Sequence, residues 1–254
     1  MVSPIFDLSG KTALITGARR GIGKAIAVAF AAHGADIIGV SAQLGEGPSE
    51  VEDQVKALGR RFTAIKCDFA NPAEVKALTE KLTDLKIDIL VNNAGITQRT
   101  PTLEHTNEMW DQVMQVNLTA PFVLAREVGK QMVERKSGKI IFIGSLWTLQ
   151  GGLNVISYAA SKHGIGGITK AISNEWAQHG VNVNAIAPGF IETDINSNLK
   201  TDMPERYAFI NSRITAKRWG KPEDIAGAAV FLASPAAEYV HGIVLSVDGG
   251  WSAN

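Results

Sequence analysis

Tyr158 and Lys162 are the residues whose types and spacing most clearly suggest chemistry. They stand in SYAASKHG, residues 157–164, a stretch of small residues that predicts a helix. Four positions span about one helical turn, so both side chains should project from the same face. A phenol normally ionises at about pH 10, and a neighbouring cation favours the phenolate. We therefore expect Lys162 to lower the pKa of Tyr158, so that the phenol can act as an acid or base. From the spacing alone, a chance pair on a helix surface is the better interpretation.

Ser145 supplies a third polar group. It follows the apolar run KIIFIG, residues 139–144, which predicts a buried strand. If the sheet is parallel, this strand should deliver Ser145 to the edge where Tyr158 and Lys162 also lie. Its hydroxyl would then hold the substrate oxygen that the tyrosine protonates.

A glycine-rich turn near the amino terminus favours dinucleotide binding. TGARRGIG, Thr16 to Gly23, joins a predicted strand to a predicted helix and contains Gly17, Gly21 and Gly23. Glycines permit a tight turn, let the backbone approach a pyrophosphate and leave helix N–H groups free to bind it. The spacing, G-x-x-x-G-x-G, is not the commoner G-x-G-x-x-G, and such a turn alone is weak evidence. Its position between a strand and a helix carries the prediction.

Two later strand ends hold further candidate cofactor contacts. Asp68 follows the third predicted strand, where its carboxylate could accept a hydrogen bond from an adenine amino group. VNNAG, residues 91–95, follows the fourth strand, and Asn92 and Asn93 could bond loop backbone groups there. The small residues after them leave room for a flat ring or a ribose. Ordinary turn chemistry would explain either asparagine alone.

The end of the second strand bears on the choice between NAD and NADP. An acidic residue there usually binds the ribose 2′-hydroxyl of NAD and repels the 2′-phosphate of NADP. This sequence has Ser41 at that position, with Arg19 and Arg20 in the glycine-rich turn as candidate phosphate ligands. Charge therefore does not exclude NADP, although both arginines could equally be solvated loop residues.

The elements that must position these residues alternate along the chain. Apolar runs at 12–16, 35–40, 62–66, 87–91, 139–144, 181–187 and 242–247 predict strands, and patterns at 21–33, 47–59, 72–84, 107–135, 157–179 and 222–233 predict helices. They predict one α/β domain over residues 1–254, a Rossmann-like, doubly wound parallel sheet of seven strands with helices on both faces. Residues 188–221 interrupt the alternation. We expect a substrate lid at about 190–220, with a surface insertion carrying a short helix pair as the alternative.

Composition narrows the classes of function. The chain has 254 residues, 45% of them hydrophobic, and 25 Lys and Arg balance 25 Asp and Glu. We therefore expect no nucleic-acid partner and no membrane association. The start MVSPIFDLSGK lacks the features of a secretory signal, and Cys67 is the single cysteine. These observations predict a cytoplasmic protein without a metal site.

In order along the chain, these motifs resemble the short-chain dehydrogenase/reductase family. The resemblance rests on TGARRGIG, NNAG, Ser145 at a strand end, Y-x-x-x-K at 158–162 and PG at 188–189, and it covers essentially the whole chain. Each motif is weak alone, whereas the set is specific. The resemblance implies an oxidoreductase that interconverts hydroxyl and ketone groups with NAD or NADP.

The resemblance also assigns roles to individual residues. Tyr158 would exchange the proton, Ser145 would orient the substrate oxygen, and Lys162 would also bind the nicotinamide ribose. Asn117, in MQVNLTAPF, would hold a water in a proton relay, and Thr193 matches the position that meets the cofactor's carboxamide and diphosphate. The full set of expected cofactor contacts is Gly17, Arg19, Arg20, Gly21, Ile22, Gly23, Ser41, Asp68, Phe69, Asn93, Ala94, Gly95, Tyr158, Lys162, Pro188, Gly189, Ile191 and Thr193.

Finer stretches resemble the members of the family that act on sugar acids. They are ALGRRF (57–62), NEWAQHGVNVNAIAPGF (174–190), AKRWGKPEDI (216–225) and VDGGW (247–251). This resemblance implies NAD as the first cofactor, with NADP a close second. A sugar acid needs a cation for its carboxylate. Arg99 is the first candidate, although a solvated loop arginine is equally plausible, and Arg213 is the second. The residues expected to face the substrate are Trp147, Gln150 and Asn154.

Assembly and alternative functions stay open at this level. Gly164, Gly166 and Gly167 predict close approach of another backbone, from a second subunit in a homotetramer or from within the monomer. A 3-oxoacyl-thioester reductase would need NADPH and a basic docking patch for an acidic carrier protein, which the balanced charge weakly disfavours. A non-catalytic dinucleotide sensor would have no need of the Ser145, Tyr158 and Lys162 constellation.

Overall fold

The computed structural model, which describes residues 3–193 and 199–253, has a parallel sheet of seven strands at its centre. The strands are β1 Thr12–Thr16, β2 Asp36–Ser41, β3 Phe62–Lys66, β4 Ile89–Asn92, β5 Gly138–Ile143, β6 Val181–Pro188 and β7 Val244–Val247. Their spatial order is β3-β2-β1-β4-β5-β6-β7. The predicted doubly wound sheet is confirmed, and the strand ends differ from the predicted ones by at most two residues.

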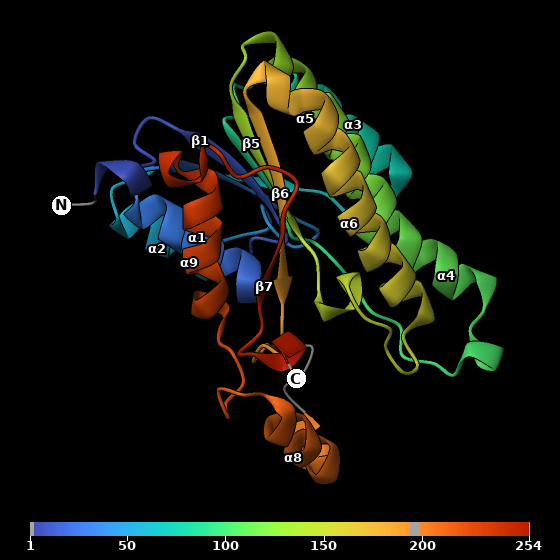
Figure 1. Cartoon of the computed structure of the whole chain (residues 1–254). Helices are drawn as coiled ribbons and strands as arrows, with labels where there is room; N and C mark the ends of the chain where they lie inside the picture. Colours follow the sequence, from blue (N-terminus) through green and yellow to red (C-terminus); the bar gives the residue numbers. More distant parts are fainter. Residues whose placement is uncertain (1–2, 194–198, 254) are drawn as a thin grey trace.

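Helices cover both faces of the sheet (Figure 1). One layer consists of α1 Gly21–Ala32, α2 Glu50–Ala57 and α9 Pro222–Ala233, and the other of α3 Pro72–Leu82, α4 Asn107–Met114, α5 Ala120–Glu134 and α6 Ile156–Trp176. Strand residues alternate between the layers. Ala13 and Ile15 of β1 belong to the apolar cluster under the first layer, and Leu14 belongs to the cluster under the second. Burial on both faces explains why the strands are almost continuously apolar.

The predicted single helix over 107–135 is interrupted in the structure. A π-helical turn, Gln115–Thr119, separates α4 from α5 and contains Asn117. The extra residue in a π turn shifts every later side chain around the helix axis, and such turns are frequent at functional sites. The apolar periodicity does not reveal it, because a single inserted residue changes the pattern by less than one turn.

The excursion over 188–221 is tied at its base. Ile191 and Gly220 form a parallel bridge, in which Glu192 N donates to Gly220 O at 2.8 Å and Gly220 N donates to Phe190 O at 2.9 Å. Between these points lie α7 Leu199–Asp202 and α8 Pro204–Arg213. In Figure 1, α8 lies beyond the end of the sheet, near the C-terminus. Residues 194–198 of the expected lid lie outside the described residues.

The described part of the chain contains no helix long and apolar enough to cross a membrane.

Candidate active site

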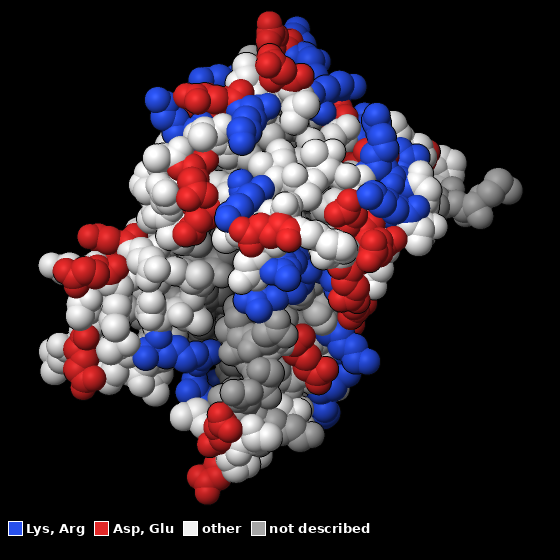
Figure 2. Space-filling view, turned by 180° about the vertical axis from the view of Figure 1, so that it is seen from behind, with Lys and Arg blue, Asp and Glu red and all other residues white. Residues whose placement is uncertain are grey.

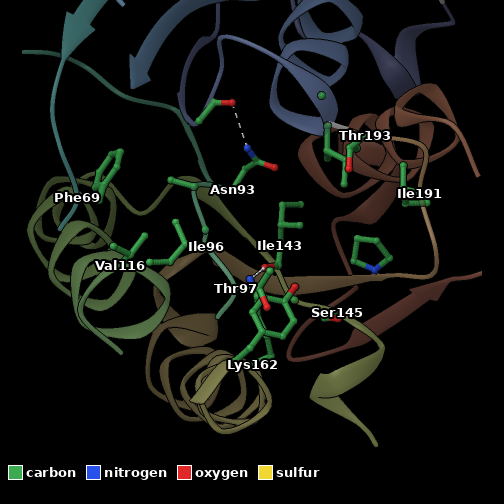
Figure 3. A pocket seen from close by; sticks show the side chains of 18 of the residues that line it. Phe69, Asn93, Ile96, Thr97, Val116, Ile143, Ser145, Lys162, Ile191 and Thr193 are labelled. Carbon is green, nitrogen blue, oxygen red and sulfur yellow. Dashed lines mark hydrogen bonds between the residues drawn. The ribbon is translucent and has the colours of Figure 1, made fainter. Parts of the chain in front are cut away.

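A cavity of about 560 Å³ lies at the carboxyl ends of the strands, over the point where the strand order reverses between β1 and β4. Open α/β sheets bind ligands at such a switch point. Figure 3 shows Phe69 and Val116 on one side, Ile191 and Thr193 across from them, and Ser145 and Lys162 together at one end. With the exception of Gly23, every predicted cofactor contact lines this cavity.

The glycine-rich turn explains why Gly23 lies outside the lining. Gly17 and Gly21 line the cavity with φ angles of 65° and 55°, a conformation that suits glycine. A Cβ on Gly23 would lie 2.2 Å from the carbonyl oxygen of Gly17. Gly23 therefore lets the first turn of α1 approach the loop that leaves β1, and it shapes the cavity without facing it.

Asn93 and Thr16 join the two loops that flank the switch point. The amide Nδ2 of Asn93 donates to Thr16 O at 2.9 Å and to Gly17 O at 3.3 Å. The hydroxyl of Thr16 accepts from the backbone N–H groups of Asn93 and Ala94, both at 2.9 Å. The expected bonding of loop backbone is thus present for Asn93. Asn92 differs: its side chain is buried, and neither amide atom has a partner among the described residues.

Residues at the ends of β2 and β3 also line the cavity. Ser41 Oγ accepts from Gln43 N at 3.2 Å, and Arg19 Nη1 donates to Gln43 Oε1 at 2.6 Å. Asp68 Oδ1 accepts from Ala70 N at 2.9 Å. Ser41, Gln43, Arg19 and Asp68 all line the cavity. This end therefore carries a guanidinium and no carboxylate at the β2 terminus.

Lys162 is held at the opposite end of the site. It is 4% exposed, and its Nζ donates to the carbonyl oxygen of Ile143 at 2.7 Å. Burial lowers the pKa of Lys162 from 10.5 to about 8. The Nζ atom lies 5.6 Å from the centre of the Tyr158 ring. The predicted side-by-side arrangement on α6 is therefore present.

The electrostatics of Tyr158 differ from the sequence-based expectation. Burial raises the pKa of the Tyr158 phenol, while a hydrogen bond involving the Ser145 side chain and the positive charge of Arg99 lower it. The ammonium of Lys162 is directed to the Ile143 carbonyl and is itself disfavoured by burial. The pKa of Tyr158 is raised overall from its usual value, and Ser145 and Arg99 oppose the effect of burial.

Asn117 lies behind the cavity wall. Its side chain is 1% exposed; its Oδ1 accepts from Ile96 N at 2.8 Å and its Nδ2 donates to Ile96 O at 2.9 Å. Nδ2 also contacts Ser161 Oγ at 3.2 Å, and that hydroxyl donates to Tyr158 O at 2.7 Å. A Cβ on Gly95 would lie 3.3 Å from Asn117 Oδ1 and 3.7 Å from Lys162 Nζ. Asn117 and Lys162 therefore both approach Gly95, and the side chain of Asn117 ties the π turn to the loop after β4.

The predicted substrate contacts separate into two groups. Arg99 and Trp147 line the cavity, whereas Gln150 and Asn154 are not among its described lining residues. Gln150 Oε1 accepts from the indole N–H of Trp251 at 3.3 Å. The carbonyl of Asn154, a residue with a φ of 59°, accepts from Thr100 N at 3.0 Å.

The C-terminal segment makes contacts that are not predicted from the sequence. The guanidinium carbon of Arg213 lies 4.1 Å from the centre of the Trp251 ring, so this second candidate cation is stacked on an aromatic side chain. Trp251 packs with Leu146, Ile210, Ile214 and Trp219 in an apolar cluster. In the sequence, the only signal for the role of Trp251 is the aromatic residue itself, in VDGGW. Among the described residues, no group of three or more His, Cys, Asp or Glu side chains is arranged to hold a metal ion.

Comparisons with known proteins agree with this geometry. A family model described as enoyl-(acyl carrier protein) reductase matches residues 17–252. A 2-dehydro-3-deoxy-D-gluconate 5-dehydrogenase from Pseudoalteromonas atlantica is 56% identical over 248 residues, which cover 97% of each chain. This chain belongs to the short-chain dehydrogenase/reductase family. It is an oxidoreductase that acts on CH–OH groups with an NAD(P) dinucleotide.

Two solved structures are also similar to this chain. One, from Agrobacterium tumefaciens with bound NADP, is 46% identical, has a TM-score of 0.93 and covers 99% of this chain and 100% of its own. The other, a gluconate 5-dehydrogenase from Burkholderia cenocepacia in complex with NADP and tartrate, is 36% identical, has a TM-score of 0.92 and covers 99% and 98%.

Proposed function

We propose that this enzyme interconverts a hydroxyl and a ketone on a sugar acid of the 2-dehydro-3-deoxygluconate or gluconate type. The observation that carries the proposal is the presence of Arg99 in the same cavity as Ser145, Tyr158 and Lys162. A guanidinium binds a carboxylate through charge-assisted hydrogen bonds. A substrate with a carboxylate at Arg99 can therefore present a carbon further along its chain to Tyr158. The sugar-acid names of the similar proteins support this substrate class.

Tyr158 is the proposed acid and base. The nicotinamide, when bound, carries the hydride. In reduction, the phenol donates its proton to the carbonyl oxygen; in oxidation, the phenolate accepts the proton of the hydroxyl. Burial favours the protonated form needed for reduction, while Ser145 and Arg99 favour the phenolate needed for oxidation. This balance suits a reversible reaction.

Lys162 and Asn117 would support the proton transfer. An ammonium has three donors, and the bond to Ile143 O uses one of them. The other two are available for the nicotinamide ribose. Asn117 would hold a relay water near Lys162, which its position beside Gly95 permits.

The proposed choice of dinucleotide rests on the residues at the end of β2 and in the glycine-rich turn. The resemblance to sugar-acid enzymes favours NAD, whereas Ser41 leaves no acid to repel a 2′-phosphate and Arg19 lies on the cavity wall. NADP in two similar structures supports the second alternative. We propose that the enzyme uses both, with Arg19 as the ligand of the 2′-phosphate.

A homotetramer is the proposed assembly. Cβ atoms on Gly164 and Gly166 would meet Leu118 and Thr148 of the same chain, so packing within the monomer explains these two glycines. Gly167 has open space around it, which is compatible with a neighbouring subunit. Light scattering on the purified enzyme measures the assembly directly.

The test of the proposed function is an activity screen with both dinucleotides. The substrates are keto-deoxy sugar acids, gluconate, unsaturated-uronate products and a short oxoacyl thioester. The proposal expects the highest kcat/KM on one of the sugar acids. A clear preference for the thioester would favour the 3-oxoacyl-thioester reductase alternative. That alternative expects a basic docking patch, but on the face in Figure 2 basic and acidic side chains are interspersed, without one large basic patch.

A further inference from the structure

Helix α8 packs against the wall of the active-site cavity. Ile210 of α8 is 4% exposed and belongs to an apolar cluster with Leu146 and Trp251, and Trp147 packs against that cluster. Leu146 and Trp147 also line the cavity. The same few side chains therefore connect α8 to the end of the cavity that follows Ser145.

Arg206 lies on this face of α8, one helical turn before Ile210. Tyr207, next to it, stacks on Trp219 with ring centres 5.2 Å apart, which fixes the rotation of the first turn. The side chain of Arg206 is exposed. It is thus carried on a fixed helix and free of the apolar cluster that anchors that helix.

Arg206 is close enough to Arg99 for the two charges to interact. Desolvation by the cavity walls lowers the pKa of Arg99, the positive charge of Arg206 lowers it further, and Tyr158 acts in the opposite direction. Arg99 also influences the pKa of Tyr158. Arg99, in the loop after β4, lines the cavity with Tyr158, and Arg206 of α8 lies outside its described lining but within electrostatic range of Arg99.

Among the residues that the structure describes, this pair of cations has no counterion. In residues 3–193 and 199–253, no carboxylate forms a salt bridge with Arg99 or Arg206. Arg218, a few residues beyond α8, behaves differently: its Nη1 and Nη2 bind the two oxygens of Asp224 at 2.6 and 3.0 Å. Like charges near one another are unfavourable unless an anion joins them.

We propose that Arg99 and Arg206 together bind the carboxylate of the substrate, so that Arg206 is a specificity residue for acids. The inference rests on the proposed function and adds to it a ligand from α8. A carboxylate has about four lone-pair sites, enough to accept hydrogen bonds from two guanidinium groups at once. Arg213, the cation that the sequence suggested on this helix, is stacked on Trp251 instead.

The experiment compares Arg206→Gln with Lys217→Gln, using the complete enzyme. Lys217 is an exposed cation just beyond α8 whose Nζ donates to Ser212 O, so its loss removes the same charge from the same segment. Steady-state kinetics are measured with a keto sugar acid and with a neutral ketose of similar length. Binding of NADPH is measured by fluorescence as a check on folding.

The proposal expects Arg206→Gln to raise KM for the acid about tenfold, the loss of roughly one charge-assisted hydrogen bond. The KM for the neutral ketose and the NADPH dissociation constant should change less than about twofold, and Lys217→Gln should resemble the wild type throughout. In the variant that combines Arg99→Gln with Arg206→Gln, the KM for the acid should rise less than the product of the two single effects, because one carboxylate contacts both residues.

An unchanged KM for the acid in Arg206→Gln would overturn the inference, and so would an equal increase in Lys217→Gln, which would indicate general attraction by the charge of the segment. A wild-type enzyme that uses the neutral ketose and no sugar acid would instead refute the proposed function, before either variant is considered.

Discussion

The two ends of the cavity are built in different ways. At the glycine-rich turn of the cofactor end, backbone groups and short side chains next to β1 and β4 contact one another, as in the bonds among Thr16, Gly17 and Asn93. At the substrate end, long side chains from distant segments meet, as when Trp251 contacts Gln150 and Arg213. Contacts made by the backbone do not depend on the identity of the side chain, whereas side chains at the substrate end can be replaced one at a time. The difference indicates that cofactor binding and substrate choice can be altered independently.

Tyr158 lies where the two ends meet, and its replacement should have the largest effect. Tyr158→Phe keeps the ring and removes the hydroxyl that exchanges the proton, so we expect turnover to fall by about two to four orders of magnitude. Cofactor binding should be retained. Stopped-flow turnover together with fluorescence titration of NADPH separates the two quantities. Turnover near the wild-type value would remove Tyr158 from the mechanism.

Lys162 should affect stability as well as turnover, in a manner that depends on pH. Its pKa falls from 10.5 in the unfolded chain to about 8 in the folded protein. Between these values the unfolded state binds the extra proton, so the free energy of unfolding should rise with pH across this window. Below about pH 8 the lysine is charged in both states, and the full penalty of burying it applies.

Lys162→Met removes this titration. The stability of the wild type relative to this variant should increase by about 3 kcal/mol between roughly pH 8 and 10.5. Urea unfolding at several pH values, followed by circular dichroism, measures the difference. A difference that stays constant with pH would show that Lys162 titrates normally in the folded protein.

Gly23 tests whether the cofactor end depends on backbone geometry. In Gly23→Ala, the new Cβ would meet Gly17 O at 2.2 Å. The strain should cost about 1–3 kcal/mol and weaken NADPH binding about tenfold or more, with the KM of the sugar acid little changed. Gly227→Ala is the matched control, because Gly227 lies in α9 with nothing within 4 Å. Equal dinucleotide affinities in the two variants would contradict the packing role of Gly23.

Trp251 should give the smallest effect, confined to the substrate end. Trp251→Phe retains an aromatic ring beside Phe190 but deletes the indole N–H that donates to Gln150. Losing one such hydrogen bond is worth about 0.5–1.5 kcal/mol, so KM for the acid should rise about twofold to tenfold. The dissociation constant of NADPH should not change. A parallel loss of cofactor affinity would show that the two ends are coupled after all.

The same contrast explains what could be predicted from the sequence. The strands and the glycine-rich turn leave local signals, because buried parallel strands are apolar throughout and turns with positive φ favour glycine. Gly17, Gly21 and Asn93 could therefore be placed at one edge of the sheet. The strands and turns that contain these three residues determine where they lie, and those elements are visible in the sequence around them.

Side-chain contacts between distant segments left no such signal. The carbonyl of Ile143 binds Lys162, but a backbone oxygen looks the same at every position in a sequence. The π turn at Asn117 and the stacking of Arg213 on Trp251 depend on how separate elements dock. In the fold, burial raises the pKa of Tyr158 while Ser145 and Arg99 oppose that shift, and none of these effects can be seen in the spacing of Tyr158 and Lys162.

The pH dependence of kcat for oxidation of a saturating neutral alcohol, in the wild type and in Arg99→Gln, tests the central claim most directly. If Tyr158 must lose its proton and Arg99 helps it to do so, kcat rises with pH as Tyr158 ionises, and the midpoint of that rise moves to higher pH in Arg99→Gln. A profile that is flat, or that has the same midpoint in both enzymes, would contradict the account.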